Sequence, residues 1–162
     1  MADTDEALTE LFGLDEPEAH APRALGVVGS REWPDKRFAC REVLRLLKHH
    51  PTLTTIVSGC QPKGVDGWAE EIAAHFELEF LGFPPAHDLE PTHPRYRPYS
   101  PGNYHDRNRL IAEHSDILIA FRWQRSSGTS STIRFAKARL CPDRVIIFDW
   151  PENTPQDLRD GP

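Results

Sequence analysis

Short apolar runs recur along this chain, and no other feature constrains the fold as strongly. Each run is four or five residues long, and the first two stop at Gly29 and Gly59. Runs this short are typical of strands that are buried on both faces of a parallel sheet. The sequence predicts strands at residues 25–28, 55–58, 79–83, 117–121 and 145–148.

Segments with a helical period separate these runs. After the first run, Cys40, Val43, Leu44 and Leu47 stand at positions i, i+3, i+4 and i+7, which is one face of a helix. Further helices are predicted at residues 65–76, 104–114 and 133–140. Strands that alternate with helices are joined by right-handed crossovers in a parallel sheet. We therefore predict a Rossmann-like, doubly wound α/β fold, with a mostly parallel sheet of about five strands and helices on both faces.

The predicted domain covers residues 24–150, and a polar segment flanks it on each side. Residues 1–18 hold seven acids and no Lys or Arg, which predicts that residues 1–23 form an acidic, mobile tail. Within it, the apolar residues between Leu8 and Leu14 could form a short amphipathic helix. Residues 151–162 are predicted to form a second polar tail.

The charge balance bears on the choice of partner. The chain carries a net charge of −6, but without both tails residues 19–150 carry +3. Duplex DNA binding normally needs a clustered basic face, so bulk charge gives no argument for it, and we expect no duplex DNA partner. No apolar run approaches the roughly 20 residues of a membrane helix. The acidic start is unlike a signal peptide, so we expect a cytoplasmic protein without a membrane partner.

The three cysteines, Cys40, Cys60 and Cys141, are odd in number and widely spaced. This pattern favours reduced thiols over a disulfide framework. The chain has no C-x-x-C pair, and His49 and His50 are adjacent in a predicted helix. We therefore expect no metal site, and the sequence indicates no cofactor.

Residues 84–102 interrupt the alternation of strands and helices. They hold six of the fifteen prolines, together with histidine, arginine and tyrosine residues. Proline at this density excludes a helix or an interior strand, so we predict a long, stiff loop. Such a loop is either a lid over a binding site or a surface excursion, and both interpretations remain open.

Four loops near the predicted strand ends carry residues suited to binding an anion. In an open parallel sheet, the ligand crevice lies outside the carboxyl ends of the strands. The loop after the first strand offers Gly29, Ser30 and Arg31. The loop after the second strand is bounded by Gly59 and Gly64 and leads into a helix that starts near Asp66, with Lys63 adding charge.

The other two loops lie near the fourth strand. Before it, Asp106, Arg107, Asn108 and Arg109 open a helix. After it, a glycine among hydroxyl residues is a good cradle for a phosphate at a helix start. These residues are Ser127, Gly128, Thr129 and Ser130. Each motif also has a purely structural interpretation, such as a turn glycine or a helix cap.

Five blocks of sequence together resemble a known family. They are GSREW, SGCQPKGVDGWAEEIA, HDRNRLI, SDILIAF and SSGTSSTI. Their succession, over about residues 24–149, resembles the SLOG superfamily of Rossmann-like nucleotide-binding proteins, and within it the YspA and YpsA-related branch of bacterial and phage proteins. The resemblance implies a nucleotide or an ADP-ribose-like ligand.

The LOG branch of this superfamily hydrolyses nucleoside monophosphates, and its pattern lands on Arg107, Gly128 and Thr129. The family's catalytic glutamate lies three residues after the threonine, where this chain has Thr132. A hydroxyl group cannot act as a carboxylate base or stabilise an oxocarbenium-like centre. Hydrolysis of the LOG type would therefore require a carboxylate from another position, namely Asp66, Glu70 or Asp106.

We predict a module that binds or senses a phosphate-bearing nucleotide. The alternatives are an N-glycosidic hydrolase or transferase that uses Asp66 with Arg107, and a DprA-like protein that binds single-stranded nucleic acid. A base could stack on Trp33 or Tyr99, although both could simply pack. We also expect a homo-oligomer, in the simplest case a dimer. The expected ligand-binding residues are Gly29, Ser30, Arg31, Gly59, Gly64, Arg107, Asn108, Ser127, Gly128, Thr129 and Ser130, and Ser30, Gly59, Arg107 and Thr129 should line one cavity.

Overall fold

The computed structural model describes residues 7, 11 and 21–151. Residues 1–6, 8–10, 12–20 and 152–162 lie outside the described part, and with them most of both predicted tails and of the expected Leu8–Leu14 helix. The predicted domain, 24–150, lies inside it.

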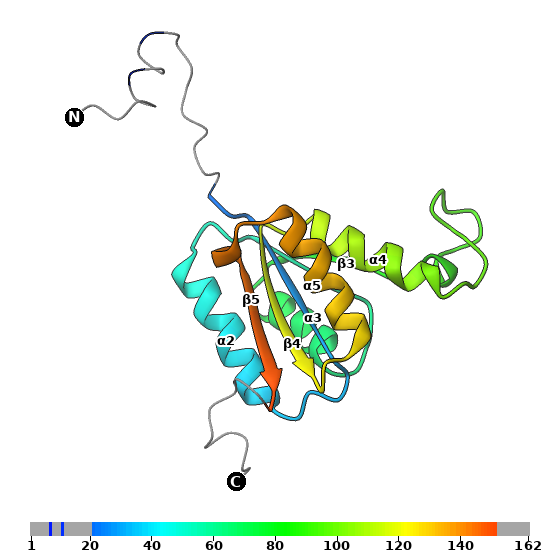
Figure 1. Cartoon of the computed structure of the whole chain (residues 1–162), viewed down its shortest axis with the longest axis horizontal. Helices are drawn as coiled ribbons and strands as arrows, with labels where there is room; N and C mark the ends of the chain where they lie inside the picture. Colours follow the sequence, from blue (N-terminus) through cyan, green and yellow to red (C-terminus); the bar gives the residue numbers. More distant parts are fainter. Residues whose placement is uncertain (1–6, 8–10, 12–20, 152–162) are drawn as a thin grey trace.

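Five parallel strands form the centre of the molecule, as predicted (Figure 1). Their order is β3-β2-β1-β4-β5, which is consistent with a Rossmann-like fold. The strands are β1 (Ala24–Gly29), β2 (Thr55–Gly59), β3 (Glu79–Phe83), β4 (Ile117–Trp123) and β5 (Val145–Trp150). Strand β4 continues two residues beyond the predicted end, because Arg122 and Trp123 pair in register with Asp149 and Trp150 of β5.

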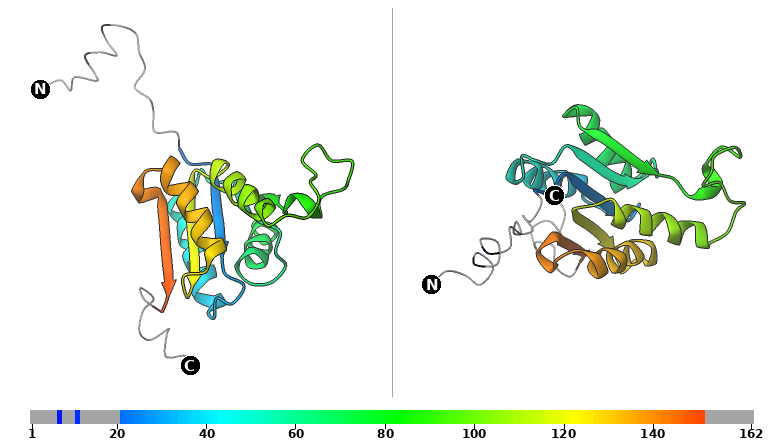
Figure 2. Two further views of the ribbon diagram at one scale, coloured as in Figure 1. Left: turned by 45° about the vertical axis from the view of Figure 1, so that its right-hand side comes forward. Right: turned by 90° about the horizontal axis from the view of Figure 1, so that it is seen from above.

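Two helices cover each face of the sheet (Figure 2). They are α2 (Lys36–His49), α3 (Val65–His75), α4 (Gly102–Glu113) and α5 (Ser127–Arg139). Asp35 caps the start of α2, since its carboxylate accepts a hydrogen bond from the backbone N–H of Phe38 at 2.9 Å. No helix among residues 21–151 is long and apolar enough to cross a membrane.

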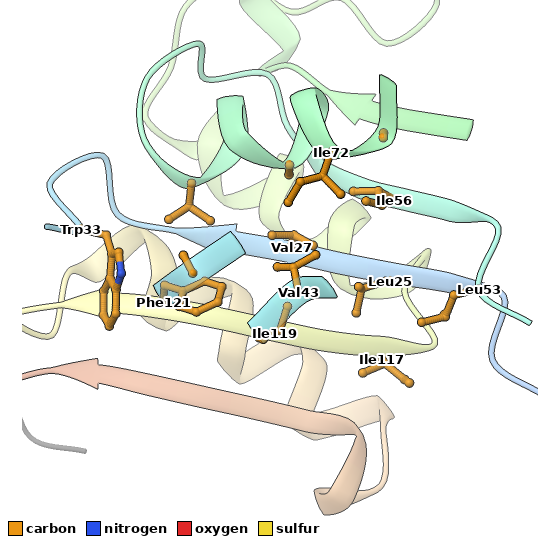
Figure 3. Packing of buried hydrophobic residues seen from close by; sticks show 14 of the residues in the cluster. Leu25, Val27, Trp33, Val43, Leu53, Ile56, Ile72, Ile117, Ile119 and Phe121 are labelled. Atoms are coloured by element: carbon orange, nitrogen blue, oxygen red, sulfur yellow. The ribbon is translucent and has the colours of Figure 1, made fainter. Parts of the chain in front are cut away.

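Alternate residues of the inner strands point to opposite faces and build two cores. Val27 packs on the side of α2 and α3, whereas its neighbour Val28 packs on the side of α4 and α5. Burial of each such side chain stabilises the fold by about 1.5–3 kcal/mol. Figure 3 shows the first core, in which Val27, Ile119 and Phe121 lie together.

Trp33 belongs to this core, so the idea that it stacks a ligand base is wrong. It is 3% exposed, and its ring lies edge-on to Phe121 at 5.4 Å (Figure 3). It also lies edge-on to Trp150 at 5.7 Å. Its indole N–H donates to the backbone carbonyl of Asp35 at 3.0 Å. The loop after β1 therefore folds back under the end of the sheet. Burial of this large ring stabilises the fold more than its exposure to solvent would.

The proline-rich loop holds a single turn of 3₁₀ helix, η1 (Ala86–Asp88). It projects from the body beyond the first turn of α4 (Figures 1 and 2). A second short turn, η2 (Pro142–Arg144), leads into β5.

The strand order reverses between β1 and β4. Chain segments leave β1 towards α2 on one face and leave β4 towards α5 on the other. A crevice therefore opens at the carboxyl ends of these two strands, which is where open α/β sheets hold their ligands.

Candidate functional site

A cavity of about 250 Å³ occupies this crevice. Val28 and Ile111 supply apolar walls, and most of the other lining residues are polar. The lining residues are Val28, Gly29, Ser30, Arg31, Glu32, Gln61, Asp66, Tyr104, Arg107, Asn108, Ile111, Ser126, Gly128, Thr129 and Thr132.

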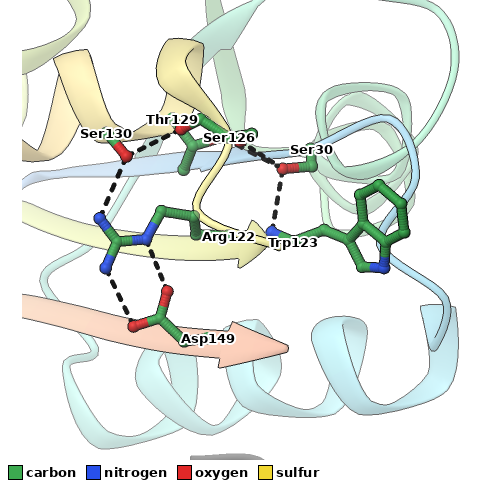
Figure 4. Close-up of polar contacts among 7 residues, drawn as sticks. All are labelled: Ser30, Arg122, Trp123, Ser126, Thr129, Ser130 and Asp149. Atoms are coloured by element: carbon green, nitrogen blue, oxygen red, sulfur yellow. Dashed lines mark hydrogen bonds and ion pairs between the residues drawn. The ribbon is translucent and has the colours of Figure 1, made fainter. Parts of the chain in front are cut away.

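Ser30 joins the two strands that frame the cavity. Its hydroxyl lies 2.7 Å from the hydroxyl of Ser126 and 3.4 Å from that of Thr129, and it accepts a hydrogen bond from the backbone N–H of Trp123 at 3.0 Å (Figure 4). Ser30 is only 6% exposed. The hydroxyl groups of the β1 and β4 loops thus form one connected cluster.

The start of α5 presents free backbone donors to this cluster. Ser126 is the N-cap, and its side chain makes no capping hydrogen bond. The first N–H groups of a helix have no partner within it and carry the positive end of its dipole. A Cβ atom built on Gly128 would meet nothing within 4 Å, so open space lies above this turn. The arrangement is suited to an anion.

Arg107 supplies a guanidinium group from α4. It donates from Nη1 to the carbonyl oxygen of Phe83 at 3.4 Å and from Nε to Oδ1 of Asn108 at 3.1 Å. Because α4 begins at Gly102, Arg107 is its sixth residue and lies in the second turn. The expectation that Arg107 and its neighbours open this helix is wrong, because proline at position 101 allows the helix to begin earlier than predicted.

Asn108 connects this guanidinium to the first turn of α5. Its side-chain amide donates to the carbonyl oxygen of Gly128 at 3.3 Å while its oxygen accepts from Arg107. Asn108 is 7% exposed. It therefore fixes Arg107 relative to the start of α5.

Asp66 lies in the first turn of α3, and the pKa of its carboxyl group differs from the ordinary value. Burial raises its pKa to about 6, against the opposing effects of Arg107, the hydroxyl of Ser58 and the backbone of Gln61. Asp66 and Arg107 approach each other above Gly59, where a Cβ atom would lie 2.6 Å from Oδ2 of Asp66 and from Nη1 of Arg107. Gly59 is thus needed for the close approach of the two charged groups.

The hydroxyl of Ser58 contacts Asp66 from the end of β2. It lies 2.5 Å from the carbonyl oxygen of Val27 and 3.2 Å from Oδ1 of Asp66, and both oxygens can accept its proton. A hydroxyl has one proton to donate, and the shorter contact is to the carbonyl, so the hydrogen bond to Asp66 is the weaker of the two. It lowers the pKa of Asp66 less than burial raises it.

Eight of the residues predicted for the site line the cavity. They are Gly29, Ser30, Arg31, Asp66, Arg107, Asn108, Gly128 and Thr129. Of the four residues expected to share one cavity, Ser30, Arg107 and Thr129 do so. Gly59 instead lies beneath Arg107 and Asp66.

Gly64, Ser127 and Ser130 lie outside the lining. Gly64 has φ of +75° and lies against the backbone of Arg31, so it positions the β1 loop. Ser127 is exposed. The hydroxyl of Ser130 accepts from Nη1 of Arg122 at 3.1 Å, which places it next to the Arg122–Asp149 pair (Figure 4).

Other expected contributors are also outside the lining. Lys63 is exposed in the loop that precedes α3. No residue of the proline-rich loop lines the cavity. Tyr99 is 69% exposed and packs against His87 with ring centroids 5.0 Å apart. In this structure, the loop does not cover the cavity.

The prediction missed seven lining residues, namely Val28, Glu32, Gln61, Tyr104, Ile111, Ser126 and Thr132. Helical spacing could have revealed Tyr104, which precedes Arg107 and Asn108 by three and four residues and so shares their face. Ser126 belongs to the hydroxyl-rich loop after the fourth strand but was not among the expected ligand-binding residues. No pattern in the sequence singles out Glu32 or Gln61.

Among the described residues, no group of three or more His, Cys, Asp or Glu side chains could hold a metal ion. Comparison of the chain with protein-family models, characterised proteins and solved structures found no match. The case for a function therefore depends on the cavity and its residues.

Proposed function

We propose that this protein binds a phosphate-bearing nucleotide, or a nucleotide-derived ligand such as ADP-ribose, in the cavity between β1 and β4. One observation carries the proposal: hydroxyl groups, the start of α5 and the Arg107 guanidinium line the same cavity at the switch point of the sheet. Switch points are the usual ligand sites of open α/β folds.

The phosphate would bind at the first turn of α5. Backbone N–H groups there, with the hydroxyls of Ser30 and Thr129, can donate to its oxygens. Arg107 and Arg31 supply positive charge from two other elements of the lining. Each charge-assisted hydrogen bond stabilises a complex by about 1.5–3 kcal/mol.

The size of the cavity favours a ligand of mononucleotide size. Its volume of about 250 Å³ lies near the lower end of small-molecule sites, which span roughly 300–1,000 Å³. A longer ADP-ribose-like molecule would leave part of its length outside. Tyr104 lies in the lining next to Arg107, with 5.9 Å from the guanidinium carbon to the ring centroid, and offers a surface on which a base can stack.

This assignment agrees with membership of the SLOG superfamily, which we propose on the five sequence blocks that resemble it. The glycine and threonine of the phosphate turn and the arginine of the HDRNR block all line the cavity. The Rossmann-like sheet supports the same proposal, although many unrelated families share that fold.

Calorimetric titration with AMP and with adenosine tests the proposal. AMP should bind, and removal of the phosphate should weaken binding by at least about tenfold.

The R107A variant should bind AMP about ten- to a hundredfold more weakly than the natural chain. The matched control is R134A, because Arg134 is exposed on α5 and outside the lining. Equal affinities for AMP and adenosine would contradict the proposal, and preferential binding of a short single-stranded oligonucleotide would favour the DprA-like alternative.

N-glycosidic hydrolysis is a second candidate, and Asp66 is the observation that favours it. A carboxyl group with a pKa of about 6 in the cavity can accept a proton near neutral pH. The oxygen of a water molecule would bond to C1′ of the ribose as the C1′–N bond breaks. Asp66 would take the proton of the water and pass it to the departing base, which leaves ribose 5-phosphate.

Thr132 supplies no carboxylate at the position of the LOG glutamate, so we assign that role to Asp66 of α3. Thr132 is 2% exposed, and its hydroxyl donates to the carbonyl oxygen of Gly128 at 3.4 Å. It thus stabilises the first turns of α5.

Incubation with nucleoside monophosphates, followed by chromatography of the released base, tests hydrolysis. D66N should abolish release while AMP still binds, and release that persists in D66N would remove Asp66 from this role.

A further inference from the structure

One face of α2 concentrates positive charge at the surface. The helix holds five Lys or Arg residues and a single acid, Glu42. Arg37, Arg41, Arg45 and Lys48 follow one another at spacings of four, four and three residues, which places them on one side of the helix. All four are exposed, and Leu44 among them is 37% exposed. These four residues and Leu44 form the basic face of α2.

The described residues neutralise little of this charge. Arg45 pairs with Glu42 at 3.4 Å, and the guanidinium of Arg41 lies 5.8 Å from the ring centroid of Phe38. Among residues 21–151, no carboxylate lies within ion-pair distance of Arg37, Arg41 or Lys48. Like charges four residues apart destabilise a helix, so an acidic partner would stabilise α2. The modest net charge of residues 19–150 conceals this clustering.

The chain itself carries a complementary segment. Residues 1–18 hold seven acids and no Lys or Arg, with apolar residues at Leu8, Leu11, Phe12 and Leu14. Acidic and apolar side chains in one segment match a face that combines cations with an exposed leucine.

This segment joins the body next to the end of α2. The hydroxyl of Thr52 donates to the carbonyl oxygen of Pro22 at 2.7 Å, and the N–H of Thr54 donates to that of Arg23 at 2.9 Å. Both threonines follow α2 within six residues. The N-terminal segment therefore leaves the body beside the loop that follows α2.

The length of the segment is sufficient. The 14 residues of α2 span about 21 Å. Twenty extended residues reach up to about 66 Å. A tether of this length gives an effective concentration on the order of millimolar, so that weak contacts suffice for binding.

We propose that residues 1–20 of this chain bind the basic face of its own α2. The acids contact Arg37, Arg41, Arg45 and Lys48, and an apolar side chain covers Leu44. The proposal does not depend on the nucleotide site, because no residue of α2 lines the cavity.

Nuclear magnetic resonance of the full chain tests the proposal. At low salt, the amides of residues 5–15 should relax like those of the body. In about 0.5 M NaCl, the bound fraction should fall at least about threefold, because salt screens exposed charges. R37E/R41E should have the same effect at low salt. Addition of E6K/E10K to R37E/R41E should restore binding, because it exchanges the charges of the two partners.

R134E/K137E is the matched control, since it reverses two exposed charges on α5 on the other face of the sheet. It should leave the relaxation of residues 5–15 unchanged.

The proposal would be overturned if residues 5–15 stay bound in R37E/R41E. It would also be overturned if the charge exchange fails to restore binding in folded protein. A bound fraction that rises with protein concentration would overturn it as well, because it would place the segment on a second copy. If residues 1–20 are not bound and an added oligonucleotide shifts the resonances of α2, the basic face would instead be a site for nucleic acid.

Discussion

At the scale of single residues, the cavity holds one half-buried carboxylate, Asp66, and the Arg107 guanidinium beside it. Asp66 would be costly to ionise without a partner, because burial favours its neutral form. Arg107 reduces this cost but does not remove it, since the pKa of Asp66 still lies at about 6. A raised pKa means that the folded protein holds the Asp66 proton more tightly than the unfolded chain does.

Asp66→Asn should therefore stabilise the protein above pH 6 and not below pH 4. The stability due to the raised pKa is complete below about pH 4 and is lost as the pH rises to about 6. The variant does not titrate there, so it should gain about 1–3 kcal/mol at about pH 8 relative to the natural chain. Urea unfolding across this pH range measures the difference. The control D106N, at an exposed position of α4, should change stability by less than about 0.5 kcal/mol, and a gain for D66N that is independent of pH would contradict the assignment.

Arg107→Ala should destabilise the protein more at pH 8 than at pH 5. Without the guanidinium, the pKa of Asp66 rises further, and the ionised carboxylate loses its opposing charge. We expect a loss of about 1 kcal/mol at about pH 8 that shrinks as Asp66 becomes protonated. In the D66N background the pH dependence of this loss should vanish. Equal losses with and without Asp66 would show that the two residues are not coupled.

At the scale of elements, the first turn of α5 combines helix formation with an open surface in the cavity. Gly128 lies in this turn, although glycine is a poor helix former. No atom within 4 Å of its missing Cβ explains the glycine by packing. Under the proposed function, close approach of a ligand to the backbone would explain it.

Gly128→Ala should therefore increase stability and decrease binding. The helix gains up to about 1 kcal/mol, whereas the new methyl group projects into the cavity lining and should reduce AMP affinity at least about tenfold. Thermal unfolding and calorimetric titration of the same variant measure both effects. G102A is a matched control, because Gly102 opens α4 outside the lining, and a Cβ atom added there would meet only Oγ of Ser100, at 3.7 Å. Unchanged AMP affinity in G128A would remove this turn from the phosphate site.

At the scale of the whole molecule, the strand order brings distant segments of the chain into one site. Ser30 and Thr129 are 99 positions apart, yet their hydroxyls lie 3.4 Å from each other. Hydrogen bonds from Arg122 to Asp149, with 3.0 Å between Nη2 and Oδ2, join β4 to the edge strand β5 at the same end of the sheet (Figure 4). A ligand in the cavity would contact residues from β1, α3, α4 and α5, so it would stabilise the folded domain as a unit.

AMP should accordingly raise the melting temperature, and adenosine should raise it much less. A ligand that binds only the folded state at a hundred times its Kd adds about 2.7 kcal/mol. For a chain of this size, that corresponds to a shift of about 5–10 °C. Differential scanning calorimetry over a series of concentrations measures the shift. Equal shifts from AMP and adenosine would mean that the phosphate does not contribute.

The sequence by itself determined the α/β class, the five strands and the loops that supply most of the cavity lining, because burial imposes a period on apolar residues and the loops after parallel strands meet at one edge of the sheet. It did not determine that Trp33 enters the core, since this depends on which surfaces the sheet leaves open. The place of Arg107 in the second turn of α4 follows from the helix start after Pro101, a local signal that the helical period of the apolar residues does not carry. Only the tertiary structure decided that Asp66 faces Arg107 above Gly59 and that Tyr104 joins the lining. The raised pKa of Asp66 has the same origin, because it depends on burial and on a charge supplied by another helix.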